Sequence, residues 1–135
     1  MKPIDQTTFG HPGGNCFSAC VASIMELSLE QVPYFMAAPE DRWYARFEAW
    51  LERRGLYPLM LPIPDGPRGW APSGYHILSG NSPRKPEDPE ALHSVVGYHG
   101  RILHDPHPSR AGLLSWIDTI VLVPMDPSKH RTVQP

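Results

Sequence analysis

Apolar residues recur at helical spacing in the first half of the chain and form short continuous runs in the second half. The first periodic stretch predicts a helix from about Asn15 to Leu27, and its apolar surface is wide enough to make it central to the fold. A second helix is predicted from about Pro39 to Arg54, with Gly55 as its stop signal. The apolar stripe of this second helix consists of Trp43, Phe47, Trp50 and Leu51.

Five short apolar segments follow, separated by loops rich in glycine and proline. They cover Tyr57–Ile63, Gly74–Gly80, Leu92–Tyr98, Arg101–His104 and Ser115–Val123. The third and fourth segments flank His99-Gly100 and form the clearest hairpin pattern. Two helices followed by five strands predict an α+β fold, with a central first helix and a second helix packed on an antiparallel β-sheet. We expect one domain over residues 1–123 and a C-terminal tail without a core over residues 124–135.

Composition narrows the classes of function. The chain has 135 residues and a net charge of -2, without a strong basic cluster, which argues against a nucleic-acid partner. No apolar run approaches the length of a membrane span, and the N-terminus lacks the apolar core of a signal peptide. We therefore expect a cytoplasmic protein with both cysteines reduced and no membrane partner. The sequence implies no particular oligomeric state.

The stretch Gly13-Gly14-Asn15-Cys16 places a cysteine at the start of the first predicted helix. Backbone N–H groups and the helix dipole favour negative charge there, and the thiolate is the nucleophilic form of cysteine. We expect Asn15 to cap the helix. Cys20 lies one turn further in and is the better candidate for core packing. A spacing of four residues suits neither an ordinary disulfide nor a Cys-x-x-Cys motif.

A cysteine nucleophile needs a base, and the base needs a group that orients it. The predicted hairpin offers His93 and Asp105 for these roles. A three-residue turn, Tyr98 to Gly100, would place His93 directly opposite Asp105 on one side of the hairpin. A two-residue turn would pair His93 with Pro106 and put Asp105 on the other face. The hypothesis therefore depends on the length of the turn.

Other histidines are weaker candidates for the base. His11 precedes the glycines, and His76 has no carboxylate at a useful spacing, so we interpret His76 as a strand-edge surface residue. The segment rich in histidine and aspartate has no tetrahedral ligand spacing, so no metal and no cofactor is predicted. That segment contains His99, His104, Asp105 and His107.

Three motifs together resemble the papain-like cysteine peptidase superfamily, and its C39-like group most closely. They are Gly-Asn-Cys-x-x-Ala-Cys-x-Ala-Ser, then His-Ser-Val-Val-Gly, then an Asp-Pro pair on the hairpin. The order Cys, His, Asp is that of the superfamily. The resemblance runs from Gln6 to Pro106 and implies a papain-like minimal core. It also implies that Cys16 is the nucleophile, His93 the general base and Asp105 the orienting carboxylate.

The same resemblance implies that Gln6 donates to the oxyanion, together with the backbone N–H of Cys16. Gln6 lies ten residues before Cys16, rather than about six as in the family pattern, with a glycine-rich insert between them. The Asn15 side chain is the alternative donor. The segment from His104 to Leu113 is similar to small proteins of phage or bacterial origin, which implies the cytosol of a bacterium or of an infected host.

The sequence thus predicts a thiol hydrolase that acts on an amide bond, most simply a peptide bond of a peptide or protein substrate. Deamidation and acyl transfer use the same triad and remain open. The alternative is a non-catalytic or host-modifying papain-like domain that binds a peptide or protein partner. The presence of all three triad candidates favours the enzyme.

Overall fold

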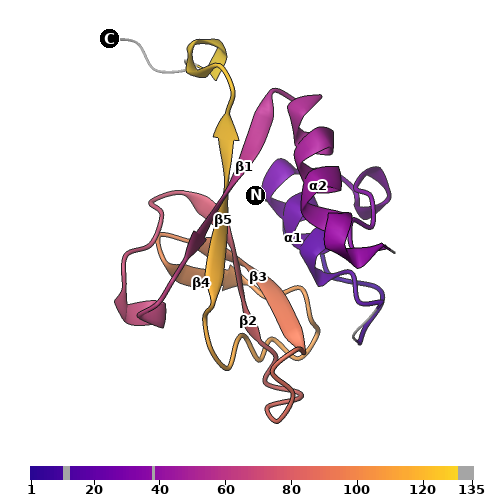
Figure 1. Cartoon of the computed structure of the whole chain (residues 1–135), viewed down its shortest axis with the longest axis vertical. Helices are drawn as coiled ribbons and strands as arrows, with labels where there is room; N and C mark the ends of the chain where they lie inside the picture. Colours follow the sequence, from indigo (N-terminus) through magenta and orange to yellow (C-terminus); the bar gives the residue numbers. More distant parts are fainter. Residues whose placement is uncertain (11–12, 38, 131–135) are drawn as a thin grey trace.

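The computed structural model describes residues 1–10, 13–37 and 39–130. Two α-helices come first, α1 (Cys16–Met25) and α2 (Trp43–Glu52). The strands are β1 (Leu56–Pro62), β2 (Tyr75–Asn81), β3 (Leu92–Tyr98), β4 (Arg101–His104) and β5 (Asp118–Pro124). Both helices lie on one side of a single five-stranded antiparallel sheet (Figure 1). The α+β class predicted from the sequence is confirmed.

Both helices are shorter than the sequence predicts. α1 ends at Met25 because Glu26 takes a left-handed conformation with φ of 55°, and its N–H bonds back to the carbonyl of Ala22. α2 begins only at Trp43 because residues 40–42 form a 3-10 turn instead. Among the described residues, no helix is long and apolar enough to cross a membrane.

The strand order in the sheet is β1-β5-β2-β3-β4, so the last strand is inserted between the first and the second. β5 begins at Asp118 rather than at Ser115. Residue 115 passes so close to β2 that a Cβ on Gly80 would overlap the carbonyl oxygen of Ser115. The N–H of Ile117 donates to the carbonyl of Ser79 over 2.8 Å, so this stretch follows β2 without forming a regular ladder.

The helix-facing side of the sheet packs on an aromatic core. Residues 17–23 of α1 are all buried, and the Phe47 and Trp50 side chains of α2 are buried beside them. Phe17, Phe35 and Phe47 meet edge to face, with ring centroids 5.0–6.2 Å apart, an arrangement that aromatic pairs prefer. Phe47, Trp50 and Leu51 of the predicted apolar stripe are core residues, whereas Trp43 is partly buried and packs against the core.

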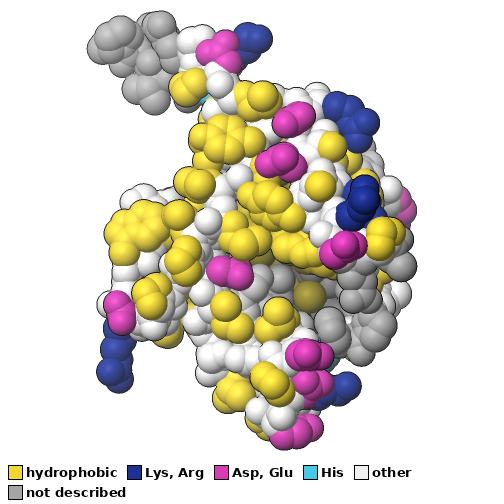
Figure 2. All heavy atoms as spheres, viewed as in Figure 1, with side chains coloured by type: hydrophobic (Ala, Val, Ile, Leu, Met, Phe, Trp, Pro, Cys, Tyr) yellow, Lys and Arg dark blue, Asp and Glu magenta, His cyan; other side chains and the backbone are white. Residues whose placement is uncertain are grey.

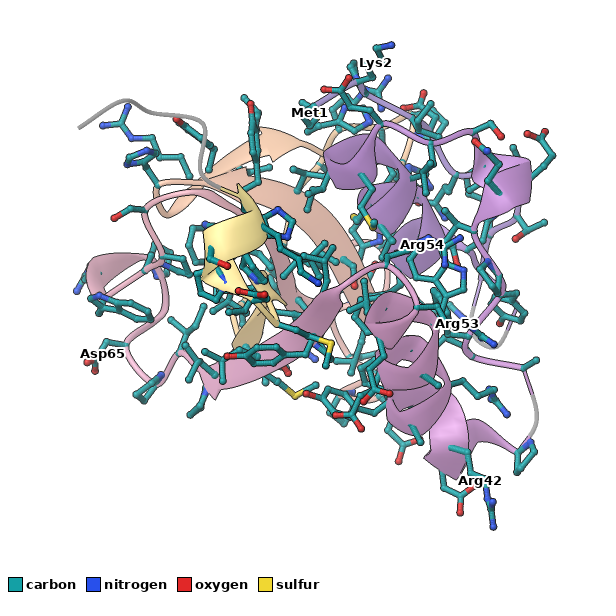
Figure 3. All side chains as sticks on the ribbon, turned by 90° about the horizontal axis from the view of Figure 1, so that it is seen from above. Met1, Lys2, Arg42, Arg53, Arg54 and Asp65 are labelled. Atoms are coloured by element: carbon teal, nitrogen blue, oxygen red, sulfur yellow. The ribbon has the colours of Figure 1, made fainter. Side chains whose placement is uncertain are left out.

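The two ends of the chain are anchored differently. Met1 and Lys2 lie together at one end of α1 (Figure 3), where the Met1 amino group forms an ion pair with Glu26 at 2.9 Å. At the other end, the N–H of Met125 donates to the carbonyl of Gly55, and residues 127–130 form a 3-10 turn. The predicted tail therefore has regular structure up to residue 130, and residues 131–135 lie outside the described residues.

The hairpin of β3 and β4 has a two-residue turn, so the predicted three-residue turn is wrong. Tyr98 pairs with Arg101, and His99 and Gly100 have φ of 52° and 76°, as a tight type I′ turn requires. Val96 then pairs with His104, because a β-bulge adds one residue to β4.

This bulge reverses the effect of the even-numbered turn. An unbulged ladder would put Asp105 on the other face of the hairpin from His93. Continued past its last pair, the shifted register sets Asp105 opposite Val95 and diagonal to His93, on the same side. Diagonal neighbours are within reach of side chains as long as histidine. The two residues therefore meet, although for a different reason from the one predicted.

His76 is a core residue, so its interpretation as a surface histidine is wrong: its side chain is fully buried. Its Nδ1 lies 2.8 Å from Thr119 Oγ1, and that hydroxyl donates to the carbonyl of Ile77. Its Nε2 accepts the N–H of Gly100 at 3.2 Å. Both ring nitrogens are satisfied only in the neutral form with the proton on Nδ1. Burial, and to a lesser extent the charge of His99, lower the pKa of His76 to about 4.

The buried neutral His76 predicts a loss of stability in mild acid. Its pKa is about 4 in the folded chain and about 6.5 when unfolded, so the unfolded chain takes up the proton first. The free energy of unfolding should fall by about 3 kcal/mol as the pH drops from about 6.5 to about 4. Denaturant titrations at a series of pH values measure this slope.

A His76→Gln variant should be less stable at neutral pH but should lack most of that slope. His130→Gln, which changes an exposed histidine, is the matched control and should keep it. An unchanged slope in His76→Gln would show that another group governs the acid response.

Candidate functional site

Cys16 is the first residue of α1 and is partly exposed, whereas Cys20 is fully buried in the core. Two cavities, of about 330 and about 200 Å³, meet at Cys16. Gly10, Gly14 and Leu92 also line both cavities. Burial raises the pKa of the Cys20 thiol well above its usual value, with smaller contributions from the charges of Cys16 and Asp105. Of the two thiols, only Cys16 opens onto a groove.

His93 and Asp105 form a buried pair at the end of the β3–β4 hairpin. The ring Nε2 of His93 lies 2.7 Å from Asp105 Oδ1, and both side chains are 3% exposed. Because Nε2 faces the carboxylate, Nδ1 is the ring nitrogen left for Cys16. No described residue forms a hydrogen bond to Cys16 Sγ. The contact between the thiol and the imidazole is therefore looser than the contact between the imidazole and the carboxylate. Catalytic hydrogen bonds are often long before a substrate binds.

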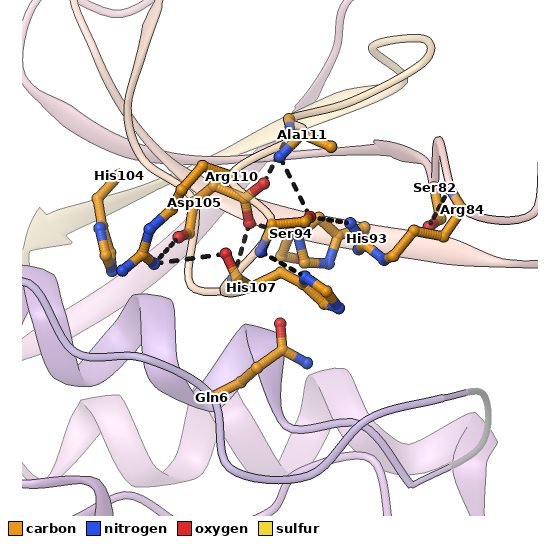
Figure 4. Close-up of polar contacts among 12 residues, drawn as sticks. Gln6, Ser82, Arg84, His93, Ser94, His104, Asp105, His107, Arg110 and Ala111 are labelled. Carbon is orange, nitrogen blue, oxygen red and sulfur yellow. Dashed lines mark hydrogen bonds and ion pairs between the residues drawn. The ribbon is translucent and has the colours of Figure 1, made fainter.

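The Asp105 carboxylate is fixed by two backbone groups besides His93 (Figure 4). The N–H of His107 donates to Oδ1 over 2.9 Å, and the N–H of Gly112 donates to Oδ2 over 2.7 Å. Burial by itself raises the pKa of Asp105, but the hydrogen bonds from His93 and from these two N–H groups outweigh it and lower the pKa. Asp105 is therefore an ionised, oriented carboxylate.

His93 is held in its protonated form. Burial by itself lowers the pKa of His93, but interactions with Asp105 and Cys16 outweigh it. The hydrogen bond to Asp105, the looser contact with Cys16 and the negative charge of both side chains raise the pKa to about 9. A protonated imidazole between a carboxylate and a sulfur stabilises the thiolate form of that sulfur. The structure thus brings Cys16, His93 and Asp105 together as one electrostatic unit.

Gln6 lines the smaller cavity together with Cys16 and His93, and its side chain is 7% exposed. In Figure 4 it rises from the N-terminal segment toward the network around His107. Its Nε2 donates to the carbonyl of Thr8 over 3.0 Å, which leaves the second hydrogen of the amide free. Its Oε1 is buried and has no protein partner among the described residues. Such an orphaned polar atom is typical of a place where a ligand or water binds.

Asn15 lines neither cavity, and it does not cap α1, contrary to the prediction. Its Oδ1 accepts the N–H groups of Thr7 and Thr8, at 2.9 and 3.0 Å, and its Nδ2 donates to Thr7 Oγ1. These three hydrogen bonds hold the Asn15 side chain against the N-terminal segment. This segment carries Gln6 to the groove, so Gln6 rather than Asn15 faces the cavity beside Cys16.

Several contacts around the site were not anticipated from the sequence. Asp5 forms a bidentate ion pair with Arg110, with distances of 2.6 and 2.9 Å, and its Oδ1 lies 3.2 Å from His104 Nε2. The N–H of Gln6 donates to the carbonyl of Pro106. These contacts fix the N-terminal segment to the loop that follows Asp105. The opposite charges of Asp5 and Arg110 make an ion pair possible. The two residues are 105 apart in the chain, however, so the sequence does not indicate that they meet.

The other candidates from the sequence are placed as follows. His107 lines the smaller cavity, and its ring centroid lies 6.2 Å from that of His93. His99 is at the hairpin turn, and His11 lies outside the described residues. Within the described part of the chain, no group of three His, Cys, Asp or Glu residues is arranged to hold a metal ion.

Comparisons with protein-family models, with curated proteins and with solved structures find no match for this chain. The chemistry of the site is therefore inferred from its own contacts. These supply, in chain order, an oriented amide, a thiol at a helix N-terminus, a protonated imidazole and an ionised carboxylate.

The shared network predicts the titration of His93. Its ring should titrate near pH 9 in the wild-type chain. Asp105→Asn removes the charge of one partner and Cys16→Ala removes the other partner, so each should move the titration toward the usual value near 6.5. NMR of the imidazole C–H signals across pH measures the shift.

The same shift affects stability above neutral pH. A histidine whose pKa is raised on folding stabilises the fold fully below about pH 6.5, and that contribution is lost as the pH rises through about 9. This window does not overlap that of His76. Titration of His93 near pH 6.5 in all three proteins would contradict the coupling.

Proposed function

We propose that this protein is a cysteine-dependent hydrolase of amide bonds, most simply peptide bonds, with a Cys16-His93-Asp105 triad. The observation that carries the proposal is the position of His93, whose ring is hydrogen-bonded to the buried Asp105 and has its pKa raised by Cys16. A surface or core histidine has no reason to lie between a carboxylate and a partly exposed thiol at the meeting point of two cavities.

The proposed fold assignment goes with this chemistry. A cysteine at the N-terminus of a buried helix, packed against an antiparallel sheet that carries the histidine and the carboxylate, is similar to the papain-like core. The chain order and the motifs around Cys16 and His93 support a C39-like member of that superfamily. The proposed setting is the cytosol of a bacterium or of an infected host.

The first half-reaction forms a thioester. The thiolate of Cys16 attacks the carbonyl carbon of the substrate, and the carbonyl oxygen takes up negative charge. As the intermediate collapses, the C–N bond breaks and His93 gives its Nδ1 proton to the leaving amine. Asp105, bonded to Nε2, keeps the ring oriented and stabilises its charge.

The second half-reaction regenerates the thiol. Neutral His93 takes a proton from a water molecule, whose oxygen attacks the thioester carbon. The C–S bond then breaks, and the released Cys16 thiolate again pairs with protonated His93. Throughout, the backbone N–H of Cys16 and the free amide hydrogen of Gln6 stabilise the oxyanion. Hydrolysis of a side-chain amide would follow the same steps, with ammonia as the leaving group.

Selective alkylation of Cys16 tests the nucleophile. Cys16 should react with iodoacetamide at pH 6–7 at least about 10-fold faster than a free thiol does, because only the thiolate reacts. His93→Ala should lower the rate toward that of an ordinary thiol. Mass spectrometry of the two cysteine peptides gives both rates in one sample, and the buried Cys20 is the internal control.

Equal and slow labelling of Cys16 and Cys20 in the wild-type chain would falsify the enzyme proposal. Fast labelling of Cys16 that does not depend on His93 would show that the thiol is reactive but would contradict the proposed triad. The alternative, a papain-like domain that only binds a peptide or protein, predicts the first of these outcomes.

Turnover itself is tested by profiling new N-termini in a proteome digested with the wild-type chain or with Cys16→Ala. Cleavage should fall by at least about a thousand-fold in Cys16→Ala, while Cys20→Ala should retain it.

Gln6→Ala should lower kcat by about 100-fold if its amide stabilises the oxyanion. Gln31→Ala, whose side chain bonds Ser28 away from the groove, is the matched control.

A further inference from the structure

The larger cavity has walls that suit an aliphatic chain. It opens at Cys16 and has a volume of about 330 Å³. Its apolar lining consists of Phe17, Met36, Trp43, Met60, Leu92 and Ile120. Figure 2 shows hydrophobic side chains gathered across the middle of the molecule, between the strands and α2, around a hollow in the surface. A group that enters this cavity next to Cys16 therefore packs mainly against carbon atoms.

Among the described residues that line this cavity, one is acidic. Asp118 begins β5 and pairs with Ser79 of β2, which in turn pairs with Ser94 of β3. All three residues line the cavity and form a polar row across the sheet. The hydroxyls of Ser79 and Ser94 bond each other over 2.8 Å. Among the described residues, Asp118 has no ion pair and no side-chain hydrogen bond to another residue.

No described side chain stabilises the negative charge of the Asp118 carboxylate. Burial raises the pKa of Asp118, which shows that its surroundings disfavour the charge. A cation supplied by a ligand would offset this cost, because a charge-assisted hydrogen bond is stronger than a neutral one. Lysine and arginine also carry aliphatic stems that pack along apolar walls.

The smaller cavity, on the other side of Cys16, has the opposite charge. Arg84 and Lys85 line it together with His107, and none of the described residues that line it is acidic. The nearby charge of Arg84 contributes, after burial, to the lowered pKa of His107. A cationic group is therefore attracted to the larger cavity and repelled by the smaller one.

We propose that the larger cavity is a subsite for a basic side chain, lysine or arginine, adjacent to the amide bond that Cys16 attacks, with Asp118 as the residue that determines this specificity. The proposal depends on the proposed amide hydrolysis for its substrate class. The selection of charge, however, is a property of the cavity and can be measured without turnover.

Protection of Cys16 from iodoacetamide tests the subsite directly. The probes are N-acetyl-lysine methylamide and N-acetyl-norleucine methylamide, which differ only in the ammonium group. The lysine compound should protect Cys16 at millimolar concentration, and the norleucine compound should need about 10-fold more or fail. Asp118→Asn should reduce protection by lysine to the norleucine level, since loss of a charge-assisted bond costs about 10- to 100-fold.

Asp65→Asn is the matched control, because Asp65 is exposed and points away from the body of the molecule in Figure 3. It should leave protection by both compounds unchanged. An unchanged NMR titration of His93 in Asp118→Asn shows that this variant is folded with an intact site. Equal protection by the two compounds, or a lysine preference that survives in Asp118→Asn, overturns the proposal.

Peptide cleavage separates the subsite from the reaction. Pairs of peptides that carry lysine or norleucine at each position beside the cleaved bond should differ by about 10- to 100-fold in kcat/KM at one position only, and Asp118→Asn should abolish the difference. Lysine-selective protection without cleavage would refute the hydrolase and support the subsite. Cleavage without any preference for lysine would refute the subsite and support the hydrolase.

Discussion

The hydrogen-bonded carboxylate of Asp105 is the interaction on which the rest of the site depends. A carboxylate that is only 3% exposed is stable as an anion when donors surround it, and here an imidazole and two backbone N–H groups do so. Those donors come from β3 and from the loop after β4, so the charge fixes both. The carbonyl of Pro106 next to it anchors Gln6. One buried charge thus orients the His93 ring, shapes the loop and positions Gln6, the proposed oxyanion donor.

Much of the fold follows from local patterns. The bounds of β3 and β4 agree with the sequence because short apolar runs on either side of a His-Gly turn are short-range signals. The insertion of β5 between β1 and β2 was not predicted, since it depends on which edges the earlier strands leave open. The turn length was wrong, and the bulge at Val96 and Gly97 that compensates for it has no sequence signal that we recognise.

In the candidate site, too, some features were predicted from the sequence and others were not. Cys16, His93 and Asp105 were found from residue types, spacing and resemblance, and the structure brings all three together. Asn15 was misread because an asparagine before a helix usually caps it, whereas here longer-range partners compete for its oxygen. His76 was misread because burial of a histidine depends on partners, such as Thr119, that only the folded sheet provides.

Two aspartates near the groove, Asp105 and Asp118, differ in their surroundings. This difference is the basis of the different roles proposed for them. Asp105 is surrounded by donors that lower its pKa, so it is a fixed charge that serves the imidazole. Burial raises the pKa of Asp118, and no described residue forms an ion pair or a side-chain hydrogen bond with it. Burial disfavours the charge of such an unpaired carboxylate, and a cation supplied by a ligand would offset that cost. In these proposals the reaction depends on Asp105 and the choice of substrate depends on Asp118, two aspartates in opposite environments.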